Sequence, residues 1–300
     1  EITTRLVGSE MCIRDRCLNM KKISRRSFLA AAGLTVAALA LTACGGSAST
    51  ASSAAASSVA ASSEAASTSA AAAELTTVEA GKLTMATNAT FPPYEMTTDA
   101  GTIEGIDVDT AQAIAEKLGL ELQIDDMDFD AALLSVQQGK ADIAMAGITV
   151  TDERMAVMSF SDSYATGIQS IIVPEGSDIA SPDDLAGKKI GTQRGTTGYL
   201  YCSDDFGEDA VVAYDSGLTA VQALNNGQVD AVVIDNEPAK AYVESNPGLK
   251  ILDTSYAEED YAIGMNKSNT ALLEAVNAAL EELKADGTLQ AIVDKYIKAE

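Results

Sequence analysis

The segments "SVQQGKADIAMAG" (residues 135–147) and "ALNNGQVDAVVID" (residues 223–235) decide the fold. Each runs from the end of an amphipathic stretch through a glycine into a short apolar run, the pattern of helix, turn and strand. An overlay of the two segments aligns these positions: Gly139 with Gly227, Asp142 with Asp230, and Gly147 with Asp235. All helix–glycine–strand units look alike, so the overlay does not establish homology of the halves. It does predict two similar α/β units in one chain.

The chain from residue 75 onward repeats this alternation of apolar runs and segments with helical periodicity, which predicts an α/β fold. Strands are expected at 82–88, 121–127, 141–147, 188–193, 210–215 and 230–235, and helices at 108–119, 129–140, 196–207 and 217–228. In open α/β sheets, ligands sit beyond the carboxyl ends of the strands. The expected binding loops are therefore "NATFPPY" (88–94), "AGITVTDER" (146–154), "QRGTTG" (193–198) and "IDNEP" (234–238). Two loops belong to each unit, so a ligand held by all four lies between the units.

The first 43 residues are not expected in the folded body. Residues 1–19 contain "LVGSEMCIRDR", which resembles a translated sequencing adapter, so we expect an assembly artefact there. Residues 20–43 join a basic head to an apolar run shorter than the roughly 20 residues of a membrane-spanning helix, which predicts a signal peptide. "LTAC" resembles a lipobox and implies lipid attachment to Cys44, whereas "SRRSFL" also fits a twin-arginine signal. Both export routes stay open.

Residues 44–74 follow as an alanine- and serine-rich linker that cannot build a core, which predicts a flexible tether. We therefore expect a protein outside the cytoplasm, anchored to the outer face of the cell membrane by the lipid on Cys44. Cys202 is the one cysteine of the body, so no disulfide is expected there.

Composition excludes several classes of function. The chain carries a formal net charge of −24, which argues against nucleic acid as a partner. It has no histidine, so the usual zinc sites and the histidine-dependent nucleophiles lose their ligands and bases. We expect a monomer that is not an enzyme and that holds no cofactor and no metal.

Two charged residues stand at expected loop positions. Arg154 follows the N-cap candidate Thr151, where a cation opposes the helix dipole at a cost of up to about 1 kcal/mol. The arginine either binds a ligand carboxylate through its guanidinium or lies on the surface, paired with a neighbouring acid: Glu153, Asp152 or Asp162. Asp235 ends an apolar strand and either caps the next segment or holds a buried ammonium group. Together Arg154 and Asp235 match the two charges of a zwitterion.

Two further features offer contacts for such a ligand. "GTQRGTTG" (191–198) lacks the dinucleotide and P-loop patterns, but its N–H groups and the hydroxyls of Thr196 and Thr197 can hold an anion. A plain turn into a helix is the alternative. Phe91 and Phe129 lie in polar surroundings and either sandwich the aliphatic part of a ligand or pack in the core.

Taken in order, the motifs resemble the extracellular solute-binding proteins of ABC importers for polar amino acids. They are "ATNATFPPYE", "EGIDVDTAQAIAEKLG", "MDFDAALLSVQQGKADIAMAGITVTDER", "FSDSY", "GTQRGTTG", "DAVVID" and "ADGTLQAIVDKY". The resemblance implies a two-lobed type II periplasmic-binding-protein fold that delivers an amino acid to an ABC transporter permease. Lobe 1 is then 75–163 plus 262–300 and lobe 2 is 168–256, with crossings near 164–168 and 257–261.

The resemblance also implies a role for single positions: Arg154 for the α-carboxylate with the Thr149 and Thr197 region, Asp235 and the Gly147 carbonyl for the α-ammonium, Phe91 and Phe129 for stacking, and Asn88, Gln193 and Ile234 for the side-chain end. Asn88 stands where an aspartate is common, which favours a polar uncharged amino acid over a basic one. Arg194 would favour an acidic one. Two alternatives remain: a ligand sensor, or an enzyme on the same fold, similar to cyclohexadienyl dehydratases or murein lytic enzymes, with Glu95 or Glu237 as its acid.

Overall fold

The computed structural model describes residues 75–297, which form two mixed α/β units, each built on its own sheet. The predicted segments 1–19, 20–43 and 44–74, including Cys44, lie outside the described residues. Within 75–297, every helix is too short or too polar to span a lipid bilayer.

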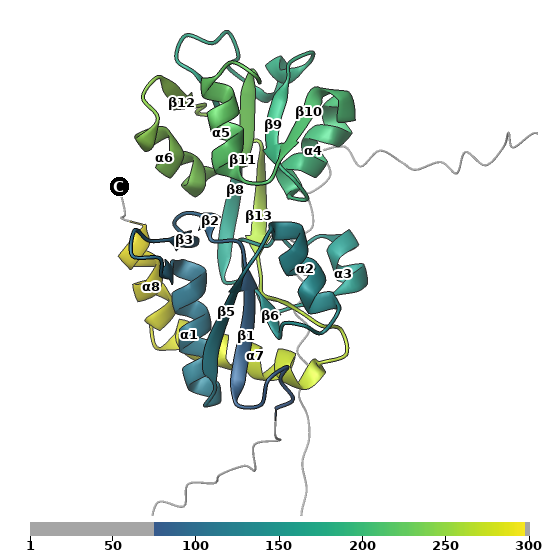
Figure 1. Ribbon diagram of the computed structural model, residues 1–300, viewed down its shortest axis with the longest axis vertical. Helices are drawn as coiled ribbons and strands as arrows, with labels where there is room; N and C mark the ends of the chain where they lie inside the picture. The colour runs from purple at the N-terminus through teal and green to yellow at the C-terminus, as the bar shows by residue number, and fades with distance from the viewer. Residues whose placement is uncertain (1–74, 298–300) are drawn as a thin grey trace, which may run out of the picture. The chain divides into compact units, whose positions relative to one another are not determined.

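The first sheet has the strand order β5-β1-β6-β14-β7 (Figure 1). β1 pairs in parallel with β5 and β6, and β14 is antiparallel to β6 and β7. Its strands are β1 (Lys82–Thr87), β5 (Glu121–Asp126), β6 (Ile143–Ala144), β7 (Ser159–Phe160) and β14 (Gly264–Met265). Its helices are α1 (Ile106–Leu118), α2 (Phe129–Gln137), α3 (Asp152–Val157), α7 (Thr270–Ala285) and α8 (Thr288–Tyr296). A small antiparallel sheet lies between β1 and α1 in the chain: β2 (Thr90–Phe91), β3 (Glu95–Thr97) and β4 (Ile103–Glu104).

The second sheet has the strand order β10-β9-β11-β8-β12, and β13 also pairs with β8. β9 is parallel to β10 and β11, whereas β8 is antiparallel to its partners. Its strands are β8 (Ala165–Pro174), β9 (Ile190–Gln193), β10 (Val211–Tyr214), β11 (Ala231–Asp235), β12 (Leu249–Ile251) and β13 (Ala257–Tyr261). Its helices are α4 (Thr197–Phe206), α5 (Gly217–Asn225) and α6 (Asn236–Ser245), with short 3-10 turns η1 (Pro182–Leu185) and η2 (Glu208–Ala210).

Two paired strands connect the sheets. The chain leaves the first sheet after β7 and enters β8, and it returns through β13 into β14. β13 lies beside β8 (Figure 1). The two strands pair in antiparallel register, with Tyr261 opposite Ala165 and Ala257 opposite Gln169. The two connections are therefore hydrogen-bonded to each other along their length.

The predicted echo between the two segments extends to their hydrogen bonds. Asp142, just before β6, accepts the N–H of Thr84 at 2.8 Å and donates its own N–H to the Thr84 carbonyl at 2.9 Å. Asp230, just before β11, makes the same reciprocal pair with Lys189, at 2.8 Å in both directions. In each unit, an aspartate thus fixes the middle strand against its parallel neighbour, so the chain leaves both strands at equivalent places.

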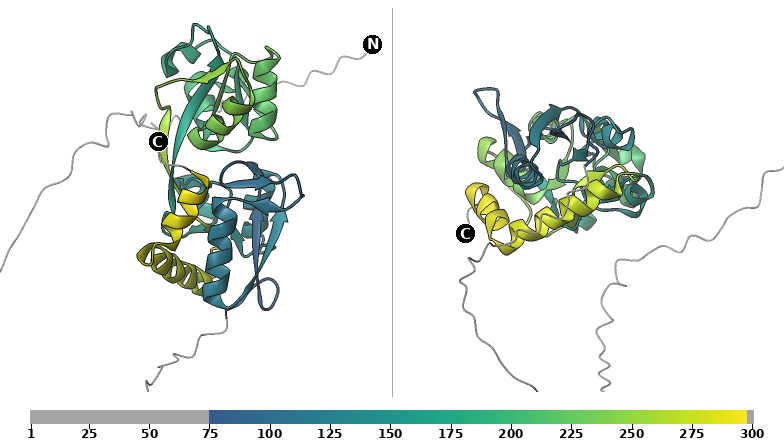
Figure 2. Two further views of the ribbon diagram at one scale, coloured as in Figure 1. Left: turned by 90° about the vertical axis from the view of Figure 1, so that its left-hand side faces the viewer. Right: turned by 90° about the horizontal axis from the view of Figure 1, so that it is seen from below.

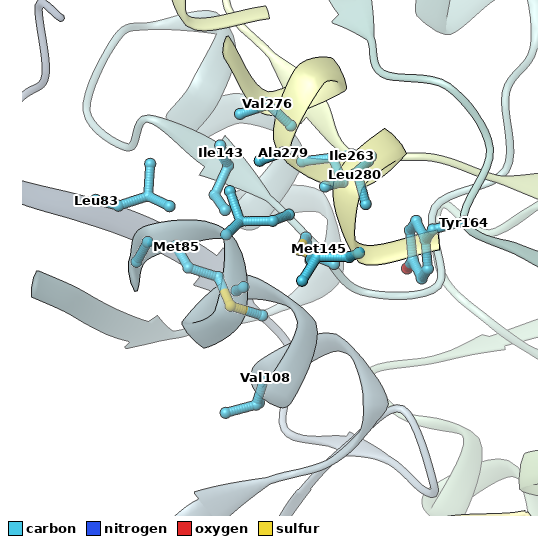
Figure 3. Packing of buried hydrophobic residues seen from close by; sticks show 14 of the residues in the cluster. Leu83, Met85, Val108, Ile143, Met145, Tyr164, Ile263, Val276, Ala279 and Leu280 are labelled. Carbon is cyan, nitrogen blue, oxygen red and sulfur yellow. The ribbon is translucent and has the colours of Figure 1, made fainter. Parts of the chain in front are cut away.

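Apolar side chains bury both sheets under helices, as the periodicity predicts. The first core joins strand residues to α7 (Figure 3): Leu83, Met85 and Ile143 against Val276, Ala279 and Leu280. α7 and α8 also pack against α1 (Figure 2). The second sheet has its own cores, which include Val232 and Ile234 with Val221 and Leu224. Each unit therefore has a core of its own. Burial of one such valine, leucine or isoleucine side chain contributes roughly 1.5–3 kcal/mol to the stability of the folded state.

The α/β class is confirmed, and the predicted helices and strands are present, most of them with shorter ends. α1 instead begins at Ile106, two residues before the predicted start. The strand expected at 141–147 is the clearest difference, because only Ile143–Ala144 pairs as β6. The residues after it turn away from the sheet at Gly147, whose φ of 55° lies in the left-handed region. This turn directs the following loop over the end of the sheet.

Candidate ligand-binding site

One cavity lies where the four predicted loops meet, at the carboxyl ends of β1, β6, β9 and β11. The space among its lining residues that protein atoms leave free amounts to about 450 Å³, with the open mouth included. All eleven binding residues predicted from the sequence line it: Asn88, Phe91, Phe129, Gly147, Thr149, Arg154, Gln193, Thr196, Thr197, Ile234 and Asp235. Five residues complete the lining: Glu95, Ala146, Gln169, Val233 and Tyr261.

Arg154 is a buried arginine, with 8% of its surface exposed. It sits in the first turn of α3, where the side chain of Thr151 caps the helix by accepting the Arg154 N–H. Its Nη1 donates to the carbonyl of Thr149 at 2.8 Å and its Nη2 to the carbonyl of Gly195 at 3.1 Å. Burial lowers the pKa of the guanidinium, although nearby acids oppose the shift. Within residues 75–297 it forms no salt bridge, so the alternative of a surface ion pair is not what the structure has.

Asp235 is the last residue of β11 and is 1% exposed. Its Oδ1 accepts the N–H of Glu237, so the residue caps α6 as one alternative expected. Its Oδ2 accepts the N–H of Ile168 at 3.0 Å and the hydroxyl hydrogen of Tyr261. Burial raises the pKa of this carboxyl to about 7, against the effect of its hydrogen bonds. Asp235 therefore caps α6 and lines the cavity at the same time.

The two phenylalanines occupy different surroundings. Phe91 stacks on Tyr94 with ring centroids 5.8 Å apart and packs partly against the cores of both units. Phe129 begins α2, and its ring lies 5.3 Å from the Arg154 guanidinium carbon. A cation at this distance is attracted by the electrons of the ring face, so Phe129 helps to hold the guanidinium. Both rings pack against protein and also line the cavity.

Asn88 and Gln193 meet across the cavity. The Gln193 Nε2 donates to the Asn88 Oδ1 at 3.0 Å, and the Asn88 Nδ2 donates to the carbonyl of Met127 at 2.9 Å. Three more close contacts also join the two units: Tyr242 to the Thr90 carbonyl, Arg154 to the Gly195 carbonyl, and Thr149 to Thr197. The structure is therefore closed over the cavity.

The remaining predicted residues hold the loops in shape. Thr196 caps α4 by accepting the N–H of Tyr199, and its hydroxyl donates to the Gln193 carbonyl, as the alternative of a helix turn expected. Gly147 donates its N–H to Asp107 at 3.0 Å, and a Cβ there would come within 2.8 Å of the Phe91 ring. A larger residue at position 147 would therefore collide with the cavity wall.

Sequence reasoning missed two buried carboxylates. Glu95 was considered only as the acid of an enzyme, yet it lines the cavity with no exposed surface. Neither of its oxygens has a hydrogen-bond partner among the described residues. Burial and the nearby Asp107 raise its pKa well above the ordinary value, and burial raises the pKa of Asp107 to about 6. Glu259, on β13, is 5% exposed and accepts a hydrogen bond from Thr149.

Arg194 lies outside the cavity, unlike its neighbour Gln193. Its side chain is exposed and approaches Asp215 at 3.7 Å. The sequence-based argument that Arg194 favours an acidic ligand therefore has no geometric basis. Adjacent residues at a strand end point in opposite directions, which puts one side chain in the cavity and the other in solvent.

Residues 83–299 match the family of bacterial extracellular solute-binding proteins, family 3. The chain belongs to this family. It is 32% identical to the L-cystine-binding protein TcyJ of Escherichia coli (strain K12) over 226 residues, which cover 74% of this chain and 85% of TcyJ. It also resembles an ancestral arginine-binding protein in two solved structures. One is bound to arginine (43% identity, TM-score 0.69, covering 72% of this chain and 98% of that one). The other is bound to glutamine (42% identity, TM-score 0.69, covering 73% of this chain and 99% of that one).

Membership in the solute-binding family confirms the predicted family and type II fold. The relatives above are named as binding proteins. Of the two acids considered for an enzyme, Glu237 pairs with Lys240 at 2.9 Å and does not line the cavity. Glu95 does line it and is fully buried.

Proposed function

We propose that this family 3 protein binds an L-α-amino acid in the cavity and delivers it to the permease of an ABC importer. The observation that carries the proposal is a pair of buried opposite charges, Arg154 from one unit and Asp235 from the other, on the wall of one closed cavity. The guanidinium takes the α-carboxylate, and the carboxylate of Asp235 takes the α-ammonium. The ring of Phe91 packs on the ligand's aliphatic part.

We assign the two units as lobes that close on the ligand about the β8–β13 pair, with lobe 1 at 75–163 plus 262–300 and lobe 2 at 168–256. Support comes from the two sheets, which have separate cores and are joined through the paired connections. Closure excludes water, and charge pairs are stronger at the lower effective dielectric constant that results. Hinge closure of this kind is a known way to hold a ligand.

We propose that the side chain of the ligand is cationic, with L-arginine as the first choice. Once a zwitterion has paired with Arg154 and Asp235, the carboxyl of Glu95 is left in the cavity wall beside the Asp107 carboxyl, with no N–H donor among the described residues. A buried polar group without a partner costs roughly 1–3 kcal/mol, and a guanidinium can supply up to five donors. The ancestral arginine-binding relative supports this choice.

L-glutamine is the second candidate, in keeping with the polar uncharged ligand that Asn88 suggests. The Asn88 and Gln193 amides lie at the same cavity and can pair with a side-chain amide. A relative described as an ancestral arginine-binding protein has also been seen with glutamine. The two candidates differ in what they ask of Glu95, since arginine needs it ionised and glutamine does not.

The remaining parts of the proposal concern the anchor and the absence of catalysis. We propose that a lipid on Cys44 and the linker 44–74 hold the body at the outer face of the membrane, as a monomer without catalytic activity. The lipobox and the composition of the linker support the anchor. Metabolic labelling of whole cells with a radioactive fatty acid, compared with Cys44→Ser, tests it.

A thermal-shift screen with the twenty amino acids tests the function. L-Arginine is expected to raise the melting temperature most, because a ligand that binds only the folded state stabilises it by mass action. L-Glutamine, L-histidine and L-cystine complete the comparison. No shift with any amino acid would overturn the proposal, and product formation from prephenate, arogenate or cell-wall fragments would replace it with the enzyme.

A further inference from the structure

Glu259 is a buried acid on a connecting strand. Along β13 the flanking Glu258 and Asp260 are exposed, whereas Glu259 is 5% exposed. Alternate residues of a strand face the same side, so Glu259 shares its side with Tyr261, which lines the cavity and bonds Asp235. The acid therefore faces the cavity wall and not solvent.

The carboxylate of Glu259 joins two cavity residues from different parts of the chain. Its Oε2 accepts the hydroxyl hydrogen of Thr149 at 2.9 Å and an amide hydrogen of Gln169 at 3.0 Å. Its Oε1 is buried and has no hydrogen-bond partner within residues 75–297. Its negative charge acts on both binding residues. It raises the pKa of Arg154, against the effect of burial, and it raises the pKa of Asp235, as burial does.

These contacts fix where the single hydroxyl proton of Thr149 points. A carboxylate only accepts hydrogen bonds, and a threonine hydroxyl has one hydrogen to donate. With that hydrogen committed to Glu259, the Thr149 oxygen offers only lone pairs to anything in the cavity. The carbonyl of the same residue already accepts from Arg154 at 2.8 Å, so Thr149 is held on both sides.

A ligand group that meets the Thr149 hydroxyl must therefore be a donor. The α-ammonium of an amino acid has three donors, and the α-carboxylate has none. An ammonium bound by Asp235 gains a second acceptor if the Thr149 oxygen faces it, whereas a carboxylate there would meet lone pairs. The orientation set by Glu259 thus assigns the Thr149 hydroxyl to the ammonium side of the ligand, and not to the carboxylate with which the resemblance groups the Thr149 region.

We propose that Glu259 is a positioning residue that holds the Thr149 hydroxyl as a hydrogen-bond acceptor for the α-ammonium of the bound amino acid. The inference rests on the proposed function. Glutamine at position 259 keeps the size but carries an amide that can donate, so the Thr149 hydroxyl is free to reverse. The effect acts through Thr149 and is therefore larger for ligands that carry the ammonium than for those that lack it.

Isothermal titration calorimetry on the full folded body tests this with matched ligands. L-Arginine is compared with 5-guanidinopentanoate, which lacks the α-ammonium, on the wild type, Glu259→Gln and the exposed neighbour variant Glu258→Gln. If the wild type selects L-glutamine, the pair is L-glutamine and 4-carbamoylbutanoate. Glu259→Gln is expected to weaken the amino acid about tenfold or more and the deaminated analogue by less than about twofold, since a hydrogen bond to a charged group is lost only with the former. Glu258→Gln is expected to change neither.

A double-mutant cycle with Thr149→Val separates positioning from support of the fold. Because both residues act on one hydrogen bond, the double variant is expected to bind L-arginine about as weakly as Thr149→Val alone. Equal losses for the amino acid and its deaminated analogue, or fully additive losses in the cycle, would overturn the inference while leaving the proposed function intact. A wild type that binds no amino acid would overturn both.

Discussion

The charged groups of the cavity wall differ in how far the protein has already satisfied them. Arg154 and Asp235 are buried and hydrogen-bonded, Arg154 to two carbonyls and Asp235 to three donors. Glu95, which is not among these contacts, is equally buried but has no partner among the described residues. Arg154 and Asp235 are pre-organised for the α-carboxylate and the α-ammonium, which every α-amino acid has. Glu95 can pair only with a donor on the ligand side chain, so it decides which amino acid binds.

The largest effect is expected from Arg154→Ala. Removing the guanidinium leaves the ligand carboxylate buried without a cation, and loss of one partner of a buried charge pair costs several kcal/mol, or about 1,000-fold in Kd. Calorimetry measures the loss. The unliganded melting temperature is expected to change by only a few degrees, because the cost of burying the guanidinium disappears as well. A variant that binds within tenfold of the wild type would break the comparison at its pre-organised residues.

Asp235→Asn is expected to come second, with a loss of about 100-fold. The amide keeps the shape of the side chain but carries no charge for the α-ammonium. One of its two ends is an NH₂ donor, which cannot accept the hydrogen bonds that Tyr261 and Ile168 donate to Asp235. Glu237→Gln, two residues along in α6 and outside the cavity, is the matched control and is expected to bind normally. Equal behaviour of the two variants would remove Asp235 from the site.

Glu95→Gln separates the group that selects the ligand side chain from the two that bind the zwitterion. The affinity for L-arginine is expected to fall about 10- to 30-fold, while that for L-glutamine changes less than about threefold, since only the guanidinium needs an ionised partner. Glu104→Gln on the neighbouring strand β4 is the control. A uniform loss for both ligands would mean that Glu95 supports the cavity and does not select the ligand.

The smallest expected effect is that of pH. Because burial raises the pKa of Asp235 to about 7, the ligand-free carboxyl binds a proton as the pH falls below that value. The α-ammonium needs the ionised form, so binding expels the proton and the affinity falls as the pH falls. For Asp235 alone, the loss is about tenfold between pH 8 and pH 6. Calorimetry at pH 6, 7 and 8 measures it, and an affinity that rises toward pH 6 would contradict the assignment.

Much of the fold was predictable because it depends on local patterns. The glycine and aspartate positions of the two echoing segments mark where strands begin and end, and the structure has helices and strands at those places. The loops at the strand ends followed from the topology of such sheets. The paired strands β8 and β13 were expected only as crossings, because their pairing joins residues far apart in the chain.

The residues that the sequence did not reveal are those whose side-chain direction is set by tertiary packing, which sequence patterns leave open. In "EED" at 258–260, three acids stand side by side, and only the register with β8 decides that Glu259 faces inward. Glu95 is the first residue of β3, the middle strand of the small sheet. Its burial depends on α1 and on Asp107, which lies beside it. Arg154 was predicted correctly as a cation at a helix start, but its burial follows from the closure of the second unit over it through Gly195.

The central claim is that opposite charges from the two units recognise the two charges of an amino acid, and one ligand–variant cycle tests it directly. Calorimetry compares L-arginine, or the amino acid that the screen selects, with the amine that lacks its α-carboxylate, agmatine in the case of arginine. The account predicts that the wild type prefers the amino acid by about 1,000-fold and that Arg154→Ala no longer distinguishes the two. An Arg154→Ala variant that still prefers the amino acid as strongly as the wild type would contradict it.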